Sequence, residues 1–129
     1  MNIIGTGIDI VDVKRIATIL KKKNNFKKRI FSIHEIKQSK NKKKNYHFFA
    51  KRFAAKEAFS KALGVGISKG LNFNEIEVFN SSKGKPSIKI RGKSINVVKK
   101  VTKKKRIKIF LSLTDESKYA IAMVIIAML

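Results

Sequence analysis

Two carboxylates stand out among the residues that could take part in chemistry. The chain has only eight Asp and Glu residues against thirty-one Lys and Arg residues, so each acid needs a physical reason for its position. Asp9 follows Gly5 and Gly7 at alternate positions, where the missing side chains leave room for a ligand beside the backbone. Glu57 lies in a segment that is apolar around most of a helix, where an unpaired carboxylate is costly.

The residues alone leave two interpretations of this pair open. Lys61 follows Glu57 by four residues, the favourable orientation for a helical ion pair, and Asp9 could cap the next helix, although Asp12 is better placed. Alternatively, the two carboxylates are hard oxygen ligands on rigid elements. Such a pair suits Mg²⁺, which keeps several waters and completes its shell with substrate phosphates.

Other catalytic arrangements find little support. His34 and His47 are isolated and are expected at the surface or at its boundary. Ser60 and Ser112 have no histidine in a pattern that would predict a hydrolase triad. The absence of cysteine excludes a disulfide scaffold and a thiolate zinc site.

The net charge of +23 predicts an anionic partner without identifying it. Nucleic acid, an anionic membrane, nucleotide phosphates and an acidic protein would all be attracted. Lysine supplies 26 of the 31 basic residues, whereas readers of bases and phosphates usually depend on arginine. A nucleic-acid-binding module is therefore a rival supported by charge and size alone, and coding bias towards lysine is a further explanation of the excess.

The elements that must position the two acids follow from the apolar patterns. Period-two alternation predicts strands, period 3.6 predicts helices, and Ser32 with Glu35 forms a capping box. Helices come early and strands late, which indicates a single α+β domain over residues 1–129 with a mainly antiparallel sheet. The predicted strands are 3–11, 73–79, 87–91, 107–113 and 119–128. The predicted helices are 13–20, a short helix that opens at Ser32, 46–63 and 94–105, with Asp12 and Ser94 as caps; 26–31 is a short basic and apolar segment, and 39–45 is a loop.

Location is predicted from both ends of the chain. The first residues show no basic region followed by an apolar signal segment. The apolar stretch 120–129 is shorter than the roughly 20 residues that a membrane helix needs. We expect a cytoplasmic protein.

Several stretches, taken in order, resemble the holo-acyl-carrier-protein synthases. GTGIDIVDVKRI at residues 5–16 looks like the first signature of this family, and RFAAKEAFSKALGVGI at residues 52–67 looks like the second, more specific one. FNEIEVF at 73–79, GKP at 84–86, SLTD at 112–115 and YAIA at 119–122 continue the match over nearly the whole chain.

The resemblance implies a phosphopantetheinyl transferase fold that assembles as a trimer, with active sites at subunit interfaces. It also implies transfer of 4′-phosphopantetheine from coenzyme A to a serine of acyl carrier protein, in support of fatty acid biosynthesis. By matching position, Asp9 and Glu57 would hold Mg²⁺ on the diphosphate and Lys61 would contact phosphate. The residues implied to line the coenzyme A site are Gly64, Gly66, Lys85 and Pro86.

The acidic acyl carrier protein is implied to dock on a basic surface near the N-terminus. The matching residues are Lys14, Arg15, Lys22, Phe26 and Arg29. A relative that kept the fold and lost catalysis is a further rival, although the intact acids argue against it.

One position departs from the pattern of many family members. They carry histidine where this chain has Asp115, so a histidine base at that position is impossible. The general base could be Asp115, a metal-bound water or Glu57, and the sequence leaves the three open.

Overall fold

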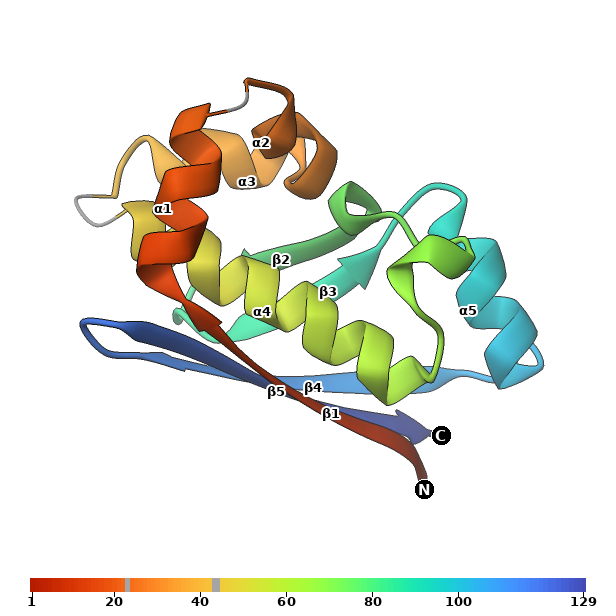
Figure 1. Ribbon diagram of the computed structural model, residues 1–129. Coiled ribbons are helices and arrows are strands. Elements are labelled where there is room, and N and C mark those ends of the chain that lie inside the picture. Colours follow the sequence, from red (N-terminus) through yellow and green to blue (C-terminus); the bar gives the residue numbers. More distant parts are fainter. Residues whose placement is uncertain (23, 43–44) are drawn as a thin grey trace.

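The structure is a computed structural model that describes residues 1–22, 24–42 and 45–129. It confirms the α+β class with antiparallel strands (Figure 1). The strands are β1 (Asn2–Asp12), β2 (Ile76–Asn80), β3 (Pro86–Ile90), β4 (Ile107–Asp115) and β5 (Tyr119–Met128), and the helices are α1 (Val13–Lys22), α2 (Asn24–Ile30), α3 (Ile33–Ser39), α4 (Asn45–Leu63) and α5 (Ser94–Thr102). Part of the predicted loop 39–45 lies outside the described residues. No helix in the described ranges has both the length and the apolar character needed to cross a membrane.

Three strands form the main sheet in the order β1-β5-β4, with both pairs antiparallel. The apolar run of β5 predicts a central strand, and this is confirmed. Long helix α4 lies along the inner face of the sheet, and β2 and β3 form a separate hairpin (Figure 1). A bulge between Ile3 and Gly5 shifts the register, so the regular alternation of β1 begins only at Gly5.

A fully buried ion pair joins α4 to its neighbours. The Nζ atom of Lys56 lies 2.8 Å from a carboxylate oxygen of Glu35 on α3, and neither side chain is exposed. Lys56 also donates to the carbonyl oxygens of Phe73 and Ile76, and Glu35 accepts from the amide of Val78. Because every charge has partners, this pair ties α3, α4 and β2 together without leaving an uncompensated buried group.

Two of the three helix starts predicted from short polar side chains are confirmed. Asp12 accepts the amides of Lys14 and Arg15 at 2.8 and 3.3 Å, which caps α1. Ser32 and Glu35 bind each other's backbone amides in a complete capping box at the start of α3.

The segment between α4 and α5 differs from the prediction. Phe73–Glu75 is a 3₁₀ turn rather than the start of a strand, because the buried Lys56 ammonium draws the carbonyls of Phe73 and Ile76 towards it. Ser94 is the first residue of α5 and not its cap, since its hydroxyl donates to Glu75.

Helix α5 also ends earlier than predicted, at Thr102. Lys103 and Lys104 both adopt the left-handed conformation, with φ of 54° and 62°. That conformation costs roughly 1–2 kcal/mol for a residue with a Cβ atom. The run of lysines therefore leaves the helix through two strained residues.

The outer face of the main sheet is apolar and uncovered in the single chain. Ile8 and Ile10 of β1 are 61% and 59% exposed, and Met123 of β5 is 43% exposed. An apolar sheet face of this kind is typical of a surface that meets another protein.

Candidate active site

Strand β1 and helix α4 approach each other through glycine. A Cβ atom at Gly7 would lie 2.9 Å from the carbonyl carbon of Ala58, and one at Gly5 would lie 2.7 Å from that of Ala62. Only residues without a side chain allow this backbone contact. It places Asp9, two residues further along the same face of β1, beside the last two turns of α4.

Asp9 is paired with Lys61. The Lys61 ammonium lies 3.1 Å from a carboxylate oxygen of Asp9 and also donates to the carbonyl oxygen of Ile8 at 3.0 Å. The sequence allows an ion pair between Lys61 and Glu57, but in the structure Lys61 pairs with Asp9 instead. The close approach of β1 to α4 brings this second carboxylate within reach of Lys61. Lys61 thus connects strand and helix at the predicted site.

The charges of Asp9 and Lys61 also act on the carboxyl group of Glu57. Burial raises the pKa of the Glu57 carboxyl above its ordinary value, the negative charge of Asp9 raises it further, and Lys61 and Arg15 oppose the rise. The structure therefore brings Asp9, Glu57 and Lys61 together, as predicted. It adds Arg15 of α1, which the sequence assigned only to partner docking.

The two carboxylates fit a magnesium ion. Among the described residues, no group of three or more His, Cys, Asp and Glu side chains could hold a metal, so the protein offers two acidic ligands here. Mg²⁺ binds through one or two carboxylates and takes its other oxygens from water and phosphate. The mutual repulsion of Asp9 and Glu57, which raises the Glu57 pKa, is what a divalent cation would relieve.

Helix α4 ends next to this group. The amides of Gly64 and Val65 bind the carbonyls of Lys61 and Ser60, which closes the helix with Gly64 at a φ of 80°. Gly64 and Gly66 are exposed, and neither has a neighbour close to its Cβ position. The predicted coenzyme A residues at this turn are therefore accessible, one turn beyond Lys61.

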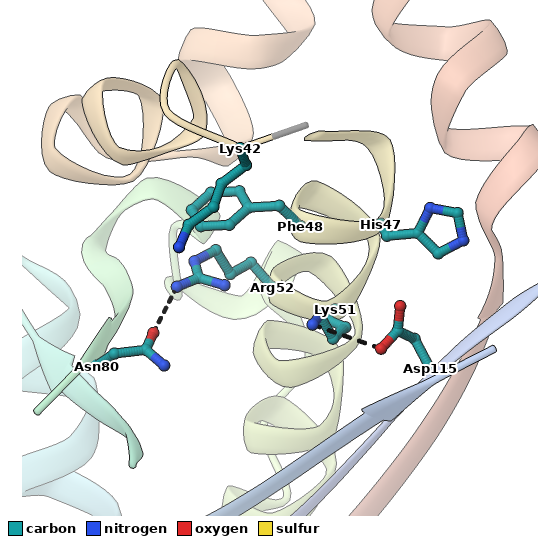
Figure 2. Close-up of a pocket in the computed structure, with 7 residues that line it drawn as sticks. All are labelled: Lys42, His47, Phe48, Lys51, Arg52, Asn80 and Asp115. Atoms are coloured by element: carbon teal, nitrogen blue, oxygen red, sulfur yellow. Dashed lines mark hydrogen bonds and ion pairs between the residues drawn. The ribbon is translucent and has the colours of Figure 1, made fainter. Parts of the chain in front are cut away.

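A second group of predicted residues lies elsewhere on the chain. Figure 2 shows a basic pocket of about 280 Å³ near the N-terminal half of α4, with Asp115 on its wall. Lys51 lies 3.5 Å from Asp115, and His47, expected at the surface or its boundary, is half-buried here. The pocket is lined by Lys42, His47, Phe48, Lys51, Arg52, Asn80 and Asp115.

Arg52 is the residue in this pocket that sequence reasoning missed. It is 4% exposed, its ring neighbour Phe48 lies 3.6 Å from the guanidinium, and Asn80 accepts one hydrogen bond at 2.7 Å. Its Nε atom has no partner within the described residues, and burial lowers its pKa to about 10. The sequence did contain a signal for Arg52, since it is a charged residue within an apolar stripe of the predicted helix. A buried guanidinium that has no carboxylate partner is suited to binding an anion.

The hairpin loop that carries Lys85 and Pro86 borders the same region. Asn80 donates to the carbonyl oxygen of Gly84, and Gly84 helps line a cavity shared with Arg52. Lys85 is exposed and Pro86 is half-buried.

The two groups do not meet within one chain. Lys51, the partner of Asp115, precedes Glu57 by six residues of α4, which separates them by about 9 Å along the helix. Strand β5 lies between Asp115 on β4 and Asp9 on β1. Within one chain, the group around Asp9 and the group around Asp115 therefore lie apart.

The predicted docking residues form one basic surface on α1 and α2. All of them except the half-buried Phe26 are exposed, while Val13 and Ile16 anchor α1 in the core. The surface is made of Lys14, Arg15, Lys22, Phe26 and Arg29. Arg15 of this surface is close enough to Glu57 for its charge to oppose the rise in the Glu57 pKa.

Comparisons with known proteins find relatives along nearly the whole chain. Residues 5–124 match the model of the 4′-phosphopantetheinyl transferase superfamily. The chain is 48% identical to a holo-[acyl-carrier-protein] synthase of Pelagibacter ubique over 98% of both chains, and 50% identical to one of Wigglesworthia glossinidia brevipalpis over 97% of this chain and 92% of that protein.

Solved structures give the same result. The synthase of Neisseria meningitidis superimposes with a TM-score of 0.86 at 32% identity, covering 97% of this chain and 98% of that one. The Bacillus anthracis synthase, solved in complex with CoA (3′,5′-ADP), superimposes with a TM-score of 0.80 at 35% identity, covering 98% and 97%. The chain belongs to the holo-[acyl-carrier-protein] synthase family of the 4′-phosphopantetheinyl transferases.

Proposed function

We propose that this chain transfers the 4′-phosphopantetheine group of coenzyme A to a serine of apo-acyl carrier protein and releases adenosine 3′,5′-bisphosphate. The serine oxygen forms a bond to the β-phosphorus, the bond from that phosphorus to the leaving nucleotide breaks, and the serine hydroxyl loses its proton. The observation that carries the proposal is the carboxylate pair of Asp9 and Glu57, held beside Lys61 by the contact of β1 with α4.

Asp9 and Glu57 would hold Mg²⁺ on the diphosphate of coenzyme A. The ion would neutralise charge on the phosphate oxygens. Lys61 fixes the orientation of Asp9 through its 3.1 Å contact and adds a positive charge at the same place. The chain contributes mainly by positioning these groups on rigid elements.

The basic pocket around Arg52 would bind an anionic part of coenzyme A. Its buried guanidinium has spare hydrogen-bonding capacity, and Lys42 and Lys51 add positive charge on the pocket wall. Lys85 and Pro86 would line the same end of the ligand, and Gly64 and Gly66 would line the other end.

The separation of the Asp9 group from the Asp115 group within one chain supports a homotrimer in which each site is completed by a neighbouring chain. The exposed apolar face of Ile8, Ile10 and Met123 offers a surface for that assembly. Under this proposal, Asp115 would act on the site of a neighbour, and its role as base stays a prediction. Light scattering tests the assembly, because a monomer at assay concentration would contradict it.

The partner would dock on the basic surface of α1 and α2. An acidic acyl carrier protein complements that charge, and Arg15 would bring it next to the reacting groups. The cytoplasmic location expected from the sequence stays a prediction.

An intact-mass assay with apo-acyl carrier protein, coenzyme A and Mg²⁺ tests the function directly. We expect the carrier to gain the mass of one phosphopantetheine, and this gain to disappear with EDTA. Glu57→Gln should keep the fold and lose most activity, whereas Glu116→Gln, an exposed glutamate on the β4–β5 turn, should retain it. Near-normal turnover of Glu57→Gln would contradict the metal assignment.

A further inference from the structure

A second basic surface lies where α5 leads into β4. Residues 99–108 contain six lysines and one arginine, and all seven side chains are exposed. None of them takes part in the ion pairs found among the described residues. The sequence from 78 to 114 has no Asp or Glu, so the positive charge of this α5–β4 basic surface is uncompensated along the chain.

This surface is far from the one proposed to dock the carrier protein. Ile107 at the start of β4 pairs with Met128, and Met128 pairs with Asn2 at the start of β1. Helix α1 follows the opposite end of β1, after Asp12, and Figure 1 shows α5 and α1 at opposite ends of the molecule. The ten steps along β1 span roughly 30 Å at about 3.3 Å per residue, so one carrier-docking role does not explain both surfaces.

The fold does not require these lysines. Lysine near the end of a helix interacts favourably with the last carbonyls, but that effect fades within one turn and is met by Lys99 and Lys100. Lys103 and Lys104 lie beyond that turn in the left-handed conformation, which glycine or asparagine adopts at lower cost. The chain thus keeps two positive charges where backbone stability favours other residues.

The composition of the surface favours a lipid headgroup layer over nucleic acid. Residues 99–108 contain no aromatic side chain on which a base could stack, and only Arg106 has the planar fork that reads phosphates and bases. Lysine clusters on an amphipathic helix attract anionic lipid, and Val101, 39% exposed within the cluster, could enter the headgroup region. We propose that the α5–β4 basic surface binds the surface of an anionic phospholipid membrane.

Flotation of the full chain with vesicles tests this proposal. We expect binding to vesicles of equimolar phosphatidylglycerol and phosphatidylcholine, weakened by salt, and no binding to pure phosphatidylcholine. Lys103→Glu/Lys104→Glu/Lys105→Glu should weaken vesicle binding by more than about tenfold. The control Lys37→Glu/Lys40→Glu/Lys89→Glu makes the same change in net charge at exposed lysines elsewhere, and its vesicle binding should weaken much less.

A second variant separates binding from folding. Lys103→Asn/Lys104→Gly removes two charges and relieves the strained backbone, so it should keep or raise the melting temperature while binding vesicles more weakly. Transfer activity with substrates in solution should be unchanged in both variants. Three outcomes would each overturn the proposal. Vesicle binding could weaken equally in the test and control triple variants, it could be independent of lipid charge, or duplex DNA or RNA at equal phosphate concentration could displace the protein from the vesicles.

Discussion

Substituting Gly7 by alanine tests whether backbone contact sets the geometry of the carboxylate pair. The new Cβ atom would lie 2.9 Å from the carbonyl carbon of Ala58 and from the amide nitrogen of Ala62, and closer still to the Ala58 carbonyl oxygen. Ordinary contact begins near 3.4 Å, and because the Ala58 oxygen is the nearest atom, β1 must withdraw from α4 by more than about 1 Å. Forcing an added methyl group into such a contact costs about 1–3 kcal/mol.

The same displacement carries Asp9 away from Glu57. Misplacement of a reacting group by about 1 Å can cost about 100-fold in rate, so we expect Gly7→Ala to lose at least about tenfold in kcat. Urea unfolding measures the stability, and the intact-mass transfer assay measures the rate. Thr6→Val, on the opposite face of the same strand, is the matched control and should change stability by less than about 0.5 kcal/mol. If Gly7→Ala kept wild-type stability and turnover, the glycine contact would not be what positions Asp9.

Three further outcomes follow from buried or bonded charges. Lys56→Met should destabilise the fold by about 3–5 kcal/mol in urea unfolding because it leaves Glu35 buried without its cation, and Lys56→Met/Glu35→Gln should recover part of that loss. Burial raises the pKa of Glu75, but hydrogen bonds from Asn72, from Ser94 and from two backbone amides outweigh it and lower the pKa below 4.5. Glu75 therefore stabilises the fold above pH 4.5 and loses that contribution as pH falls through its lowered pKa, so Glu75→Gln should show a flatter stability profile below pH 4.5. Arg52→Met should raise the KM for coenzyme A by more than about tenfold with a smaller effect on kcat. An unchanged KM would contradict a role of Arg52 in binding coenzyme A.

The fold was predictable where one local signal decides an element. Alternation identified β1 and β4, a continuous apolar run identified β5, and the polar side chains of Asp12 and Ser32 marked two helix starts correctly. The errors lie where a distant group decides instead. Lys56 of α4 turns the chain at Phe73, and Glu75 takes the hydroxyl of Ser94, and neither contact has a signature in the local sequence.

The site was predictable as a set of residues but not as an arrangement. The rarity of acids in a basic chain pointed to Asp9 and Glu57, which the structure places in one electrostatic group. The pairing of Lys61 with Asp9 depends on contact between elements far apart in sequence. The distance of Asp115 from that group follows from strand order, which no motif encodes.

The burial around Glu57 has a consequence for how the protein opens. Its neighbours Lys56 and Ala58 are fully buried, and Lys56 is bonded to three separate segments. Amide hydrogens of this turn should exchange with solvent only through unfolding of the whole chain, whereas the exposed hairpin loop 81–85 should exchange through local fluctuations. Coenzyme A would thus contact a rigid helix α4 on one side and the hairpin loop 81–85, which can change conformation on binding, on the other.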